Sequence, residues 1–482
     1  MFQLRHPSPV AVDAGIPPDA PRRSPHRSLP RTLGHVLVVA ATFLVIAASS
    51  IAFGLRVTPL RSVSALGQTV AVGVTTPSFS LSGPGEVDLF GQPLPTKVRF
   101  LGPVRPRLVL TNITINQQVA GLFVPGSGDG AAARLGDLLA GAWRRYFVSE
   151  IAFVALGALL LLGAVAGWRR HAWTWRRTVA TIAGGLVLVE ALNVGVIMLT
   201  AYTAPGRFHD VHSLGELVGQ SEQGPIAAAP GPALPGVQAV VLGDSTAAGL
   251  GEPPVPGATP VDQACGRSVD AYAEHLADVN RWRVENLACS GATIQAGVLG
   301  PQDVDGKLLS AQLAVAKRAV AASTIIVSVG ANDLQWGPMI RLCAISDRCD
   351  DRASTVFFQR SLALFTRDYY ELLRQLAALP RDPQVLINLY YSPFDTSADC
   401  LPGLTPAKIG VLLARLDALN AILAQGAATF GYLATQPDFS GHGACGPQSY
   451  VQGMDDPAPF HPNARGQLVI ALADERALLG AP

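Results

Sequence analysis

Charged side chains are scarce in this sequence. Asp, Glu, Lys and Arg make up 15% of the 482 residues, whereas soluble proteins average about 25%. Only four of the cationic residues are lysines, and the formal net charge is +1. Because proteins that bind nucleic acid by electrostatics carry a large basic surplus, this balance excludes that class. The mean hydropathy of +0.31 indicates instead that part of the chain lies in a membrane.

Three long apolar runs account for the low charge. The first, Val36 to Leu55, contains no charged residue over 20 positions, which is enough to cross a bilayer. We predict membrane helices over 35–55, 147–168 and 178–202. A signal peptide is the alternative for the first run, with Ala47-Ala48-Ser49 as small residues for cleavage. The long preceding segment and the length of the run favour an uncleaved anchor.

The distribution of arginine predicts how these helices are oriented. Segment 169–177, RRHAWTWRR, is densely cationic, and the Pro- and Arg-rich segment 1–34 shows no apolar period. Cationic loops stay in the cytoplasm, so we expect both segments there, with 1–34 as a disordered tail. Segment 56–146 and the C-terminal half of the chain then lie outside the cell. Arg144 and Arg145 are on the disfavoured side for this rule.

Segment 56–146 is rich in Val, Thr, Gly and Pro. Stretches such as KVRFLGPVRPRLVLTNITI are typical of short strands joined by turns. We therefore expect a small extracellular β-rich domain. It contains no catalytic constellation, and either glycan binding or packing against the rest of the protein is compatible with its sequence.

Two polar features of the membrane region are candidate sites. Glu190 lies near the middle of the third run, and an intramembrane carboxylate is a functional candidate by default. The alternative is a protonated Glu190 that is hydrogen-bonded to Asn193, or to Ser and Thr on neighbouring helices. His209-Asp-Val-His212 follows this run. Because no further ligand set accompanies it, a solvated pair of histidines is favoured over a metal site.

Beyond a Pro/Ala/Gly linker at 203–236, the pattern changes to alternating strands and helices. We expect strands at 237–243, 282–288, 324–330, 384–391 and 431–434, and helices at 268–280, 307–321, 353–379, 405–429 and 464–479. Such alternation is typical of a doubly wound α/β domain. We assign residues 237–482 to this domain, with a mostly parallel five-stranded sheet.

All six cysteines lie inside this domain. The outer face of a membrane permits disulfides, although six cysteines allow many pairings. We expect the sequential pairs Cys265–Cys289, Cys343–Cys349 and Cys400–Cys445, each of which would close a loop between core elements. A zinc site is the competing interpretation, but no paired CxxC spacing supports it.

Four short motifs stand at the ends of predicted strands or in late loops. They are GDS with Ser245, CSGAT with Gly291, GANDL with Asn332, and FHPN with His461. Because parallel strands bring the loops after their carboxyl ends to one edge of the sheet, these residues are expected to meet there. Acyl transfer needs a hydroxyl nucleophile, a base and donors for the oxyanion. Ser245 and His461 supply the first two, and Gly291 and Asn332 supply donors.

Together and in this order, the motifs resemble the SGNH/GDSL hydrolase family, whose name records Ser, Gly, Asn and His. The resemblance covers about residues 237–482, and the cysteine usage looks like the actinobacterial extracellular esterase and lipase branch. It implies an α/β three-layer sandwich and an oxyanion hole made of the N–H groups of Ser245 and Gly291 and the amide of Asn332. It also implies that no metal or organic cofactor is needed.

One departure from the family concerns the partner of the histidine. The family usually has Asp three residues before it, where this sequence has Ala458. Asp455 and Asp456 are nearby candidates for a third triad member. Otherwise the Ala458 backbone carbonyl accepts the imidazole N–H and gives a Ser–His dyad, which we favour.

We therefore predict a membrane-anchored extracellular serine esterase or lipase that forms an acyl-Ser245 intermediate. Its partners would be the membrane and an acyl ester of the cell envelope, such as an acylated glycan or a lipid, with no nucleic acid. Two alternatives remain open. An acyltransferase would pass the acyl group to an envelope sugar, and a catalytically silent ectodomain would only bind an envelope ligand.

Overall fold

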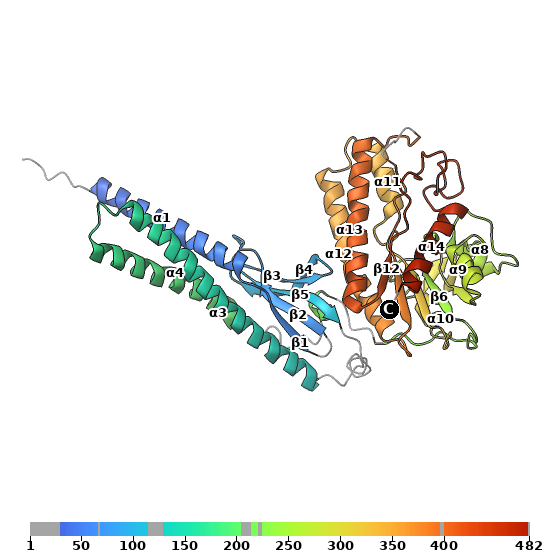
Figure 1. Cartoon of the computed structure of the whole chain (residues 1–482), viewed down its shortest axis with the longest axis horizontal. Helices are drawn as coiled ribbons and strands as arrows, with labels where there is room; N and C mark the ends of the chain where they lie inside the picture. Colours follow the sequence, from blue (N-terminus) through green and yellow to red (C-terminus); the bar gives the residue numbers. More distant parts are fainter. Residues whose placement is uncertain are drawn as a thin grey trace, which may run out of the picture.

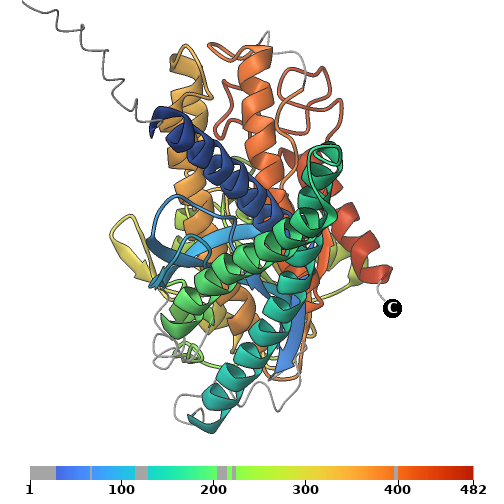
Figure 2. The same cartoon turned by 90° about the vertical axis from the view of Figure 1, so that its left-hand side faces the viewer.

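The computed structural model describes residues 29–65, 68–113, 129–203, 214–219, 224–395 and 400–480. Three long helices occupy one end of the molecule, and a layered α/β region occupies the other (Figure 1). A five-stranded sheet lies between the three helices and the α/β region. Viewed from the helical end, the blue α1 and the green helices cross one another in front of the rest of the chain (Figure 2).

The three helices are α1 (Leu29–Val57), α3 (Asp129–Trp168) and α4 (Trp175–Thr203). Each contains a segment long and apolar enough to cross a membrane: Leu33–Val57, Gly141–Trp168 and Trp175–Leu199. Within the bundle, Ala47, Val154 and Val189 from the three helices are fully or almost fully buried in one cluster. Most of the remaining apolar side chains point outward, as expected for helices whose solvent is lipid.

Two predicted boundaries are wrong. The segment 56–146 is not β-rich throughout, because its last strand ends at Ile113 and residues 129–146 already belong to α3. The helix-forming run AAARLGDLLAGAWRRYF extends α3 beyond the apolar stretch, and its charged residues concealed this continuity from a search for apolar runs. Residues 29–34 of the expected tail are helical, and residues 1–28 lie outside the described residues.

The sheet next to the bundle has the order β1-β2-β5-β3-β4. Its strands are β1 (Arg61–Ala65), β2 (Gln68–Val74), β3 (Ser82–Leu89), β4 (Gln92–Leu101) and β5 (Pro106–Ile113). The pairing is antiparallel except between β3 and β5. Trp143 of α3 donates its indole N–H to the Gly73 carbonyl of β2 at 3.1 Å, which attaches the sheet to the helix.

The second sheet is parallel throughout, with the order β12-β11-β10-β6-β7. Its strands are β6 (Ala239–Gly243), β7 (Val284–Asn286), β10 (Thr324–Ser328), β11 (Gln384–Asn388) and β12 (Leu433–Thr435). Side chains of β6 alternate between two cores: Val240 and Leu242 join one, and Val241 joins the other. A sheet buried on both faces explains why its strands read as continuous apolar runs.

Helices cover both faces of this sheet, which gives the expected three-layer sandwich (Figure 1). On one side lie α12 (Arg352–Ala377) and α13 (Pro406–Phe430), and on the other lie α9 (Tyr272–Asn280) and α14 (Ala464–Leu479). Shorter helices are α6 (Leu214–Leu217), α7 (Ser245–Ala248), α8 (Pro260–Cys265), α10 (Gln312–Ala316) and α11 (Trp336–Ile345).

The helix predicted over 307–321 is wrong for most of its length. Residues 302–309 form a hairpin of β8 (Gln302–Val304) and β9 (Lys307–Leu309), and only α10 is helical in this region. Asp305 and Gly306 have φ angles of 51° and 76° at the turn. An Asp-Gly pair with two positive φ angles is the favoured two-residue hairpin turn, a signal that was present in the sequence.

The second half of the expected linker is attached to the α/β region. The N–H of Ile226 donates to Gln375 Oε1 at 3.1 Å, and those of Ala229 and Leu234 donate to backbone carbonyls of residues 314 and 318. Its proline content prevents a helix or strand, so its backbone groups bond to neighbours instead. The candidate histidines His209 and His212 lie outside the described residues.

The first sheet is anchored to the α/β region by an aromatic side chain. Phe90 forms the β3–β4 turn with a φ angle of 57° and is 3% exposed. Its ring lies 5.7 Å from that of Tyr369, 6.3 Å from Tyr370 and 6.5 Å from Phe430. A positive φ angle is unfavourable for an aromatic residue. The burial of the ring against α12 and α13 offsets this strain.

We therefore expect Phe90→Ala to lower the free energy of unfolding of the full chain in detergent by about 3–5 kcal/mol, the usual range for a buried phenylalanine. The matched control is Phe79→Ala, since Phe79 is fully exposed on the same sheet-bearing segment. Thermal unfolding of both variants provides the measurement. Equal Tm values for the two variants would contradict this account of the anchor.

Candidate active site

Ser245 follows the carboxyl end of β6, the neighbour of the central strand β10. Asp244 caps α7 by accepting a hydrogen bond from the N–H of Thr246 at 2.9 Å, and Ser245 is the first residue of that short helix. Gly243 is required at the exit of the strand, because a side chain there would collide with the Ser328 carbonyl of β10. This turn explains the small residues around the serine.

His461 lies in the loop before α14 and contacts the serine directly. Its Nε2 is 2.8 Å from Ser245 Oγ. The loop is fixed on both sides of the ring: Tyr391 donates its hydroxyl to the Phe460 carbonyl at 3.0 Å, and the N–H of Gln452 donates to the His461 carbonyl at 2.8 Å. An imidazole in this position can take the hydroxyl proton and activate the oxygen as a nucleophile.

The partner of the second ring nitrogen differs from every predicted candidate. Nδ1 of His461 faces the backbone carbonyl of Pro459 at 3.3 Å. The Ala458 carbonyl instead accepts the backbone N–H of His461 at 3.1 Å, in a turn. In this turn the next carbonyl along the chain, that of Pro459, is the one that faces the ring.

Neither predicted carboxylate meets the imidazole. Asp456 accepts the N–H of Gly453 at 2.7 Å, and within the described residues Asp455 makes no hydrogen bond to His461. The arrangement is therefore a Ser–His pair supported by the Pro459 carbonyl. A neutral carbonyl orients the ring but contributes only a dipole, where a carboxylate would contribute a charge.

Gly291 and Asn332 line the same cavity as Ser245 and His461, with a volume of about 520 Å³. Gly291 has a φ angle of 79°, and its N–H makes no hydrogen bond within the described part of the chain. Asn332 donates one amide hydrogen to the Ala292 carbonyl at 3.0 Å, which leaves its second amide hydrogen for a ligand. The sequence-predicted residues of this site are thus brought together.

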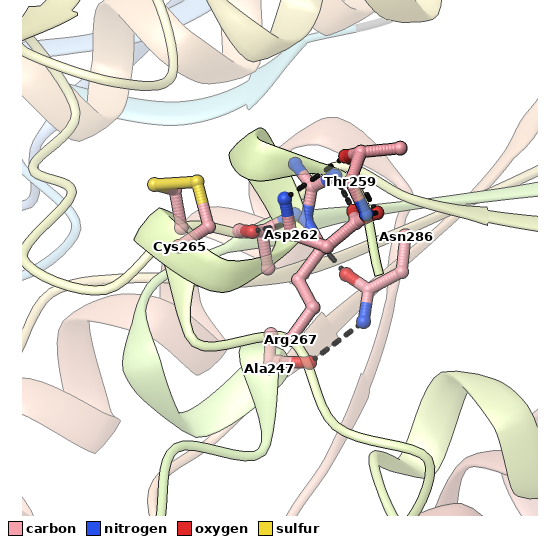
Figure 3. Close-up of polar contacts among 8 residues, drawn as sticks. Ala247, Thr259, Asp262, Cys265, Arg267 and Asn286 are labelled. Atoms are coloured by element: carbon pink, nitrogen blue, oxygen red, sulfur yellow. Dashed lines mark hydrogen bonds and ion pairs between the residues drawn. A yellow bond between two sulfur atoms is a disulfide. The ribbon is translucent and has the colours of Figure 1, made fainter. Parts of the chain in front are cut away.

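The loop that carries Gly291 is braced by residues that the sequence analysis missed (Figure 3). Arg267 donates to the Ala288 carbonyl and to Asp262, both at 2.9 Å. Asn286 donates to the Ala247 carbonyl of α7 at 3.0 Å, and its oxygen accepts the N–H of Ala288. These contacts tie the loop to the helix that begins at Ser245. No spacing rule indicates such side-chain bonds to distant backbone.

The cysteines are joined in the sequential pairs Cys265–Cys289, Cys343–Cys349 and Cys400–Cys445. The first pair closes the loop before Gly291, as the sulfur atoms in Figure 3 indicate. Among the residues described by the structure, no cluster of three His, Cys, Asp or Glu side chains has the geometry to hold a metal ion.

The surroundings of Glu190 in α4 differ from the predicted ones. Asn193 donates its amide to Glu150 of α3 at 3.0 Å, and Glu190 makes no hydrogen bond within the described residues. Asn193 is turned toward the neighbouring helix instead of along its own. Glu150 lies inside the second predicted apolar run but was not among the predicted site residues.

Two carboxyl groups flank the site, of which Asp244 is fully buried and Asp333 is half-buried. Asp244 accepts the hydroxyl of Tyr390 at 2.7 Å, and burial raises the pKa of its carboxyl group. Asp333, which follows Asn332, accepts the N–H of Ile294 at 3.0 Å. Burial raises the pKa of Asp333 to about 7, and the charges of Asp368 and Asp244 add to that rise. Near neutral pH, Asp333 is therefore partly protonated in the native state.

The raised pKa of Asp333 predicts that this group lowers the stability of the folded state by an amount that depends on pH. Between about pH 4, its unfolded pKa, and pH 7, the native state binds more protons than the unfolded state, so stability falls as pH rises. We expect Asp333→Asn, which keeps the acceptor for Ile294, to gain stability relative to wild type across this window. The gain should level off above pH 7 and reach at most about 4 kcal/mol. Urea unfolding at pH 4.5, 6 and 8 measures it, and a pH-independent difference would contradict the prediction.

Residues 241–469 match the model of the GDSL-like Lipase/Acylhydrolase family. A lipase of Streptomyces rimosus is 24% identical over 253 residues, which cover 51% of this chain and 87% of that protein. The crystal structure of an extracellular lipase from the same organism is 22% identical and covers 51% of this chain and 100% of its own, with a TM-score of 0.41. Phospholipase A1 from Streptomyces albidoflavus NA297 is 21% identical with the same coverage and a TM-score of 0.40. The α/β region of the chain thus carries a GDSL-like lipase and acylhydrolase domain, and ester hydrolysis is the activity that this family supports.

Proposed function

We propose that the protein cleaves acyl esters through a covalent intermediate on Ser245. The observation that carries this proposal is the 2.8 Å contact between Ser245 Oγ and His461 Nε2, made beside Gly291 and Asn332 in one cavity. A hydroxyl, a base and two further donors at the same position are what acyl transfer requires.

The reaction follows from these positions. His461 Nε2 takes the hydroxyl proton while Oγ bonds to the ester carbonyl carbon. The N–H groups of Ser245 and Gly291 and the amide of Asn332 stabilise the resulting oxyanion. His461 then protonates the leaving alcohol oxygen as its bond to carbon breaks, which leaves the acyl group on Ser245. A water molecule, deprotonated by the same imidazole, releases the acid and restores the serine.

The cavity favours an apolar acyl chain over acetate. Beyond the polar residues, its wall includes Ile340 of α11 and Leu416 and Leu419 of α13, all of them buried. Apolar surface of this kind gains free energy by covering methylene groups. The volume of about 520 Å³ is far more than an acetyl group fills. A lipid or a lipid-like ester is the substrate class that these features support.

We further propose that the catalytic region lies on the outer face of the cell membrane. The loop between α3 and α4 carries Arg169 and Arg170, and the first turn of α4 carries Arg176 and Arg177, which favours a cytoplasmic position for that end of the bundle. The α/β region follows the opposite end of α4, and its three disulfides suit an oxidising compartment. The enzyme would then act on esters of the envelope or of its surroundings.

The proposal predicts that the full chain in detergent hydrolyses p-nitrophenyl esters and that Ser245→Ala abolishes the activity. Ser440→Ala, at an exposed loop position, is the matched control and should remain active. We expect kcat/KM to be higher for octanoate than for acetate because of the apolar wall. Unchanged hydrolysis by Ser245→Ala would overturn the mechanism. A wild-type protein that is labelled by a fluorophosphonate at Ser245 but releases no acid would indicate acyl transfer instead.

The dyad arrangement makes a separate prediction. Asp455→Asn and Asp456→Asn should retain kcat within about twofold, because neither carboxylate orients the imidazole in the structure. His461→Ala should lower kcat by about 10⁴-fold or more, as loss of the base does in serine hydrolases. Steady-state kinetics on one ester compares the three variants. A large loss in Asp455→Asn would show that a carboxylate reaches the ring during turnover.

A further inference from the structure

The donor that Gly291 offers to the oxyanion belongs to a peptide unit with a second polar atom. The carbonyl of Ser290 and the N–H of Gly291 are parts of one planar trans peptide, so they point in opposite directions. Any bond that fixes the carbonyl therefore fixes the direction of the N–H. Gln302 supplies such a bond: its Nε2 donates to the Ser290 carbonyl at 2.8 Å.

Gln302 is held in a confined place. It is the first residue of β8 in the β8–β9 hairpin, and it is 8% exposed. Its Oε1 points to Gly297, where a Cβ atom would approach to 2.9 Å, and it makes no hydrogen bond within the described residues. Because the Ser290 carbonyl is only an acceptor, the amide nitrogen must face it. The orientation of the side chain is thus determined by this single bond.

Other bonds in the loop hold Ser290 without reaching its carbonyl. Its N–H and its hydroxyl both donate to the Cys265 carbonyl, at 3.0 and 2.7 Å. They fix the position of the residue, while rotation of the peptide that follows is restrained by Gln302. The glycine at 291 makes this restraint necessary, because a residue without a side chain gives its peptide units more rotational freedom.

We infer that Gln302 is a positioning residue that orients and polarises the Ser290–Gly291 peptide as an oxyanion donor. A hydrogen bond to the Ser290 carbonyl makes the Gly291 N–H a stronger hydrogen-bond donor, since consecutive hydrogen bonds polarise one another. The effect is realised when negative charge develops on the substrate oxygen, so it acts on kcat. This inference rests on the function proposed above and adds a residue to its machinery.

Two substitutions test the bond in the full chain in detergent. Gln302→Met keeps the length of the side chain but removes the donor, and Gln302→Glu replaces the donor with a repelling carboxylate. We expect kcat for p-nitrophenyl octanoate to fall about tenfold in the first and more in the second, at unchanged KM. Loss of a complete oxyanion donor costs about 10²–10³ in kcat, and here the donor remains but is misdirected. Lys307→Ala, exposed in the same hairpin, is the control and should match wild type.

Two readouts separate positioning from a merely structural role. An alkyl boronic acid forms a tetrahedral adduct on Ser245 with an oxygen in the oxyanion position, so its inhibition constant should rise in parallel with the loss of kcat. In Gln302→Glu, the ratio of variant to wild-type kcat should increase as pH falls, because a protonated carboxyl group again donates to the Ser290 carbonyl. A folding defect alone would move neither quantity in this way.

The outcomes distinguish this inference from the function on which it rests. If wild type is active, Ser245→Ala is inactive and Gln302→Met keeps its kcat and boronate affinity, the role of Gln302 is refuted while the function stands. If wild type is inactive or Ser245→Ala remains active, the proposed function fails first. If Gln302→Met loses its cooperative thermal transition, the pH ratio of Gln302→Glu decides the matter, and a flat ratio refutes the role.

Discussion

The loops of the candidate site depend on one requirement: buried backbone amides must be hydrogen-bonded even where no strand or helix serves them. A parallel sheet places its functional loops beyond the ends of the strands, where the ladder bonds stop. In this chain several of the missing bonds come from buried glutamine side chains. Gln312 of α10 is the most complete case, since it accepts the N–H of Gly243 at 2.8 Å and donates to the carbonyl of the same residue at 2.9 Å. Three more serve the other loops: Gln302 binds Ser290, Gln452 binds Leu250 and Ala458, and Gln467 binds Thr246 and Tyr272. An amide suits this task because it offers a donor and an acceptor without a charge to desolvate.

Tyr390 links the two loops of the site that follow the neighbouring strands β6 and β10. Its hydroxyl donates to Asp244 and accepts the N–H of Ala331 at 2.9 Å. Asp244 precedes the nucleophile and Ala331 precedes Asn332, so one hydroxyl sets the distance between nucleophile and oxyanion donor. The Asp244 carboxylate also accepts the N–H of Thr246. These two bonds offset part of the unfavourable burial of the carboxyl group, whose pKa still stays above its ordinary value.

The sequence predicted those parts of the structure that depend on local pattern and on the geometry of parallel sheets. The strands of the α/β region were identified because both faces are buried, and Ser245, Gly291, Asn332 and His461 were expected at one edge because carboxyl ends of parallel strands meet there. The pattern of residue types along the sequence does not determine which of several nearby groups a side chain bonds to. The imidazole faces the Pro459 carbonyl, while the Ala458 carbonyl accepts a backbone N–H in a turn. Asn193 bonds to Glu150 on the adjacent helix instead of Glu190 on its own. Both depend on side-chain directions set by tertiary packing, which spacing along the chain does not determine.

The three apolar helices and the α/β region are connected by more than the intervening chain. Phe90 stacks edge-on against Tyr369, whose ring is stacked on Phe365 with centroids 5.5 Å apart. Phe365 in turn packs against Gly330, and a Cβ atom at that glycine would approach its ring to 3.1 Å. Gly330 begins the loop that carries Asn332, so a continuous line of packed side chains runs from the sheet beside the bundle to the oxyanion loop. Because packed interiors resist deformation, this contact fixes the orientation of the cavity relative to the helices. A tether of flexible chain would allow the α/β region to turn freely, whereas the shared core holds its cavity in one orientation relative to the three helices.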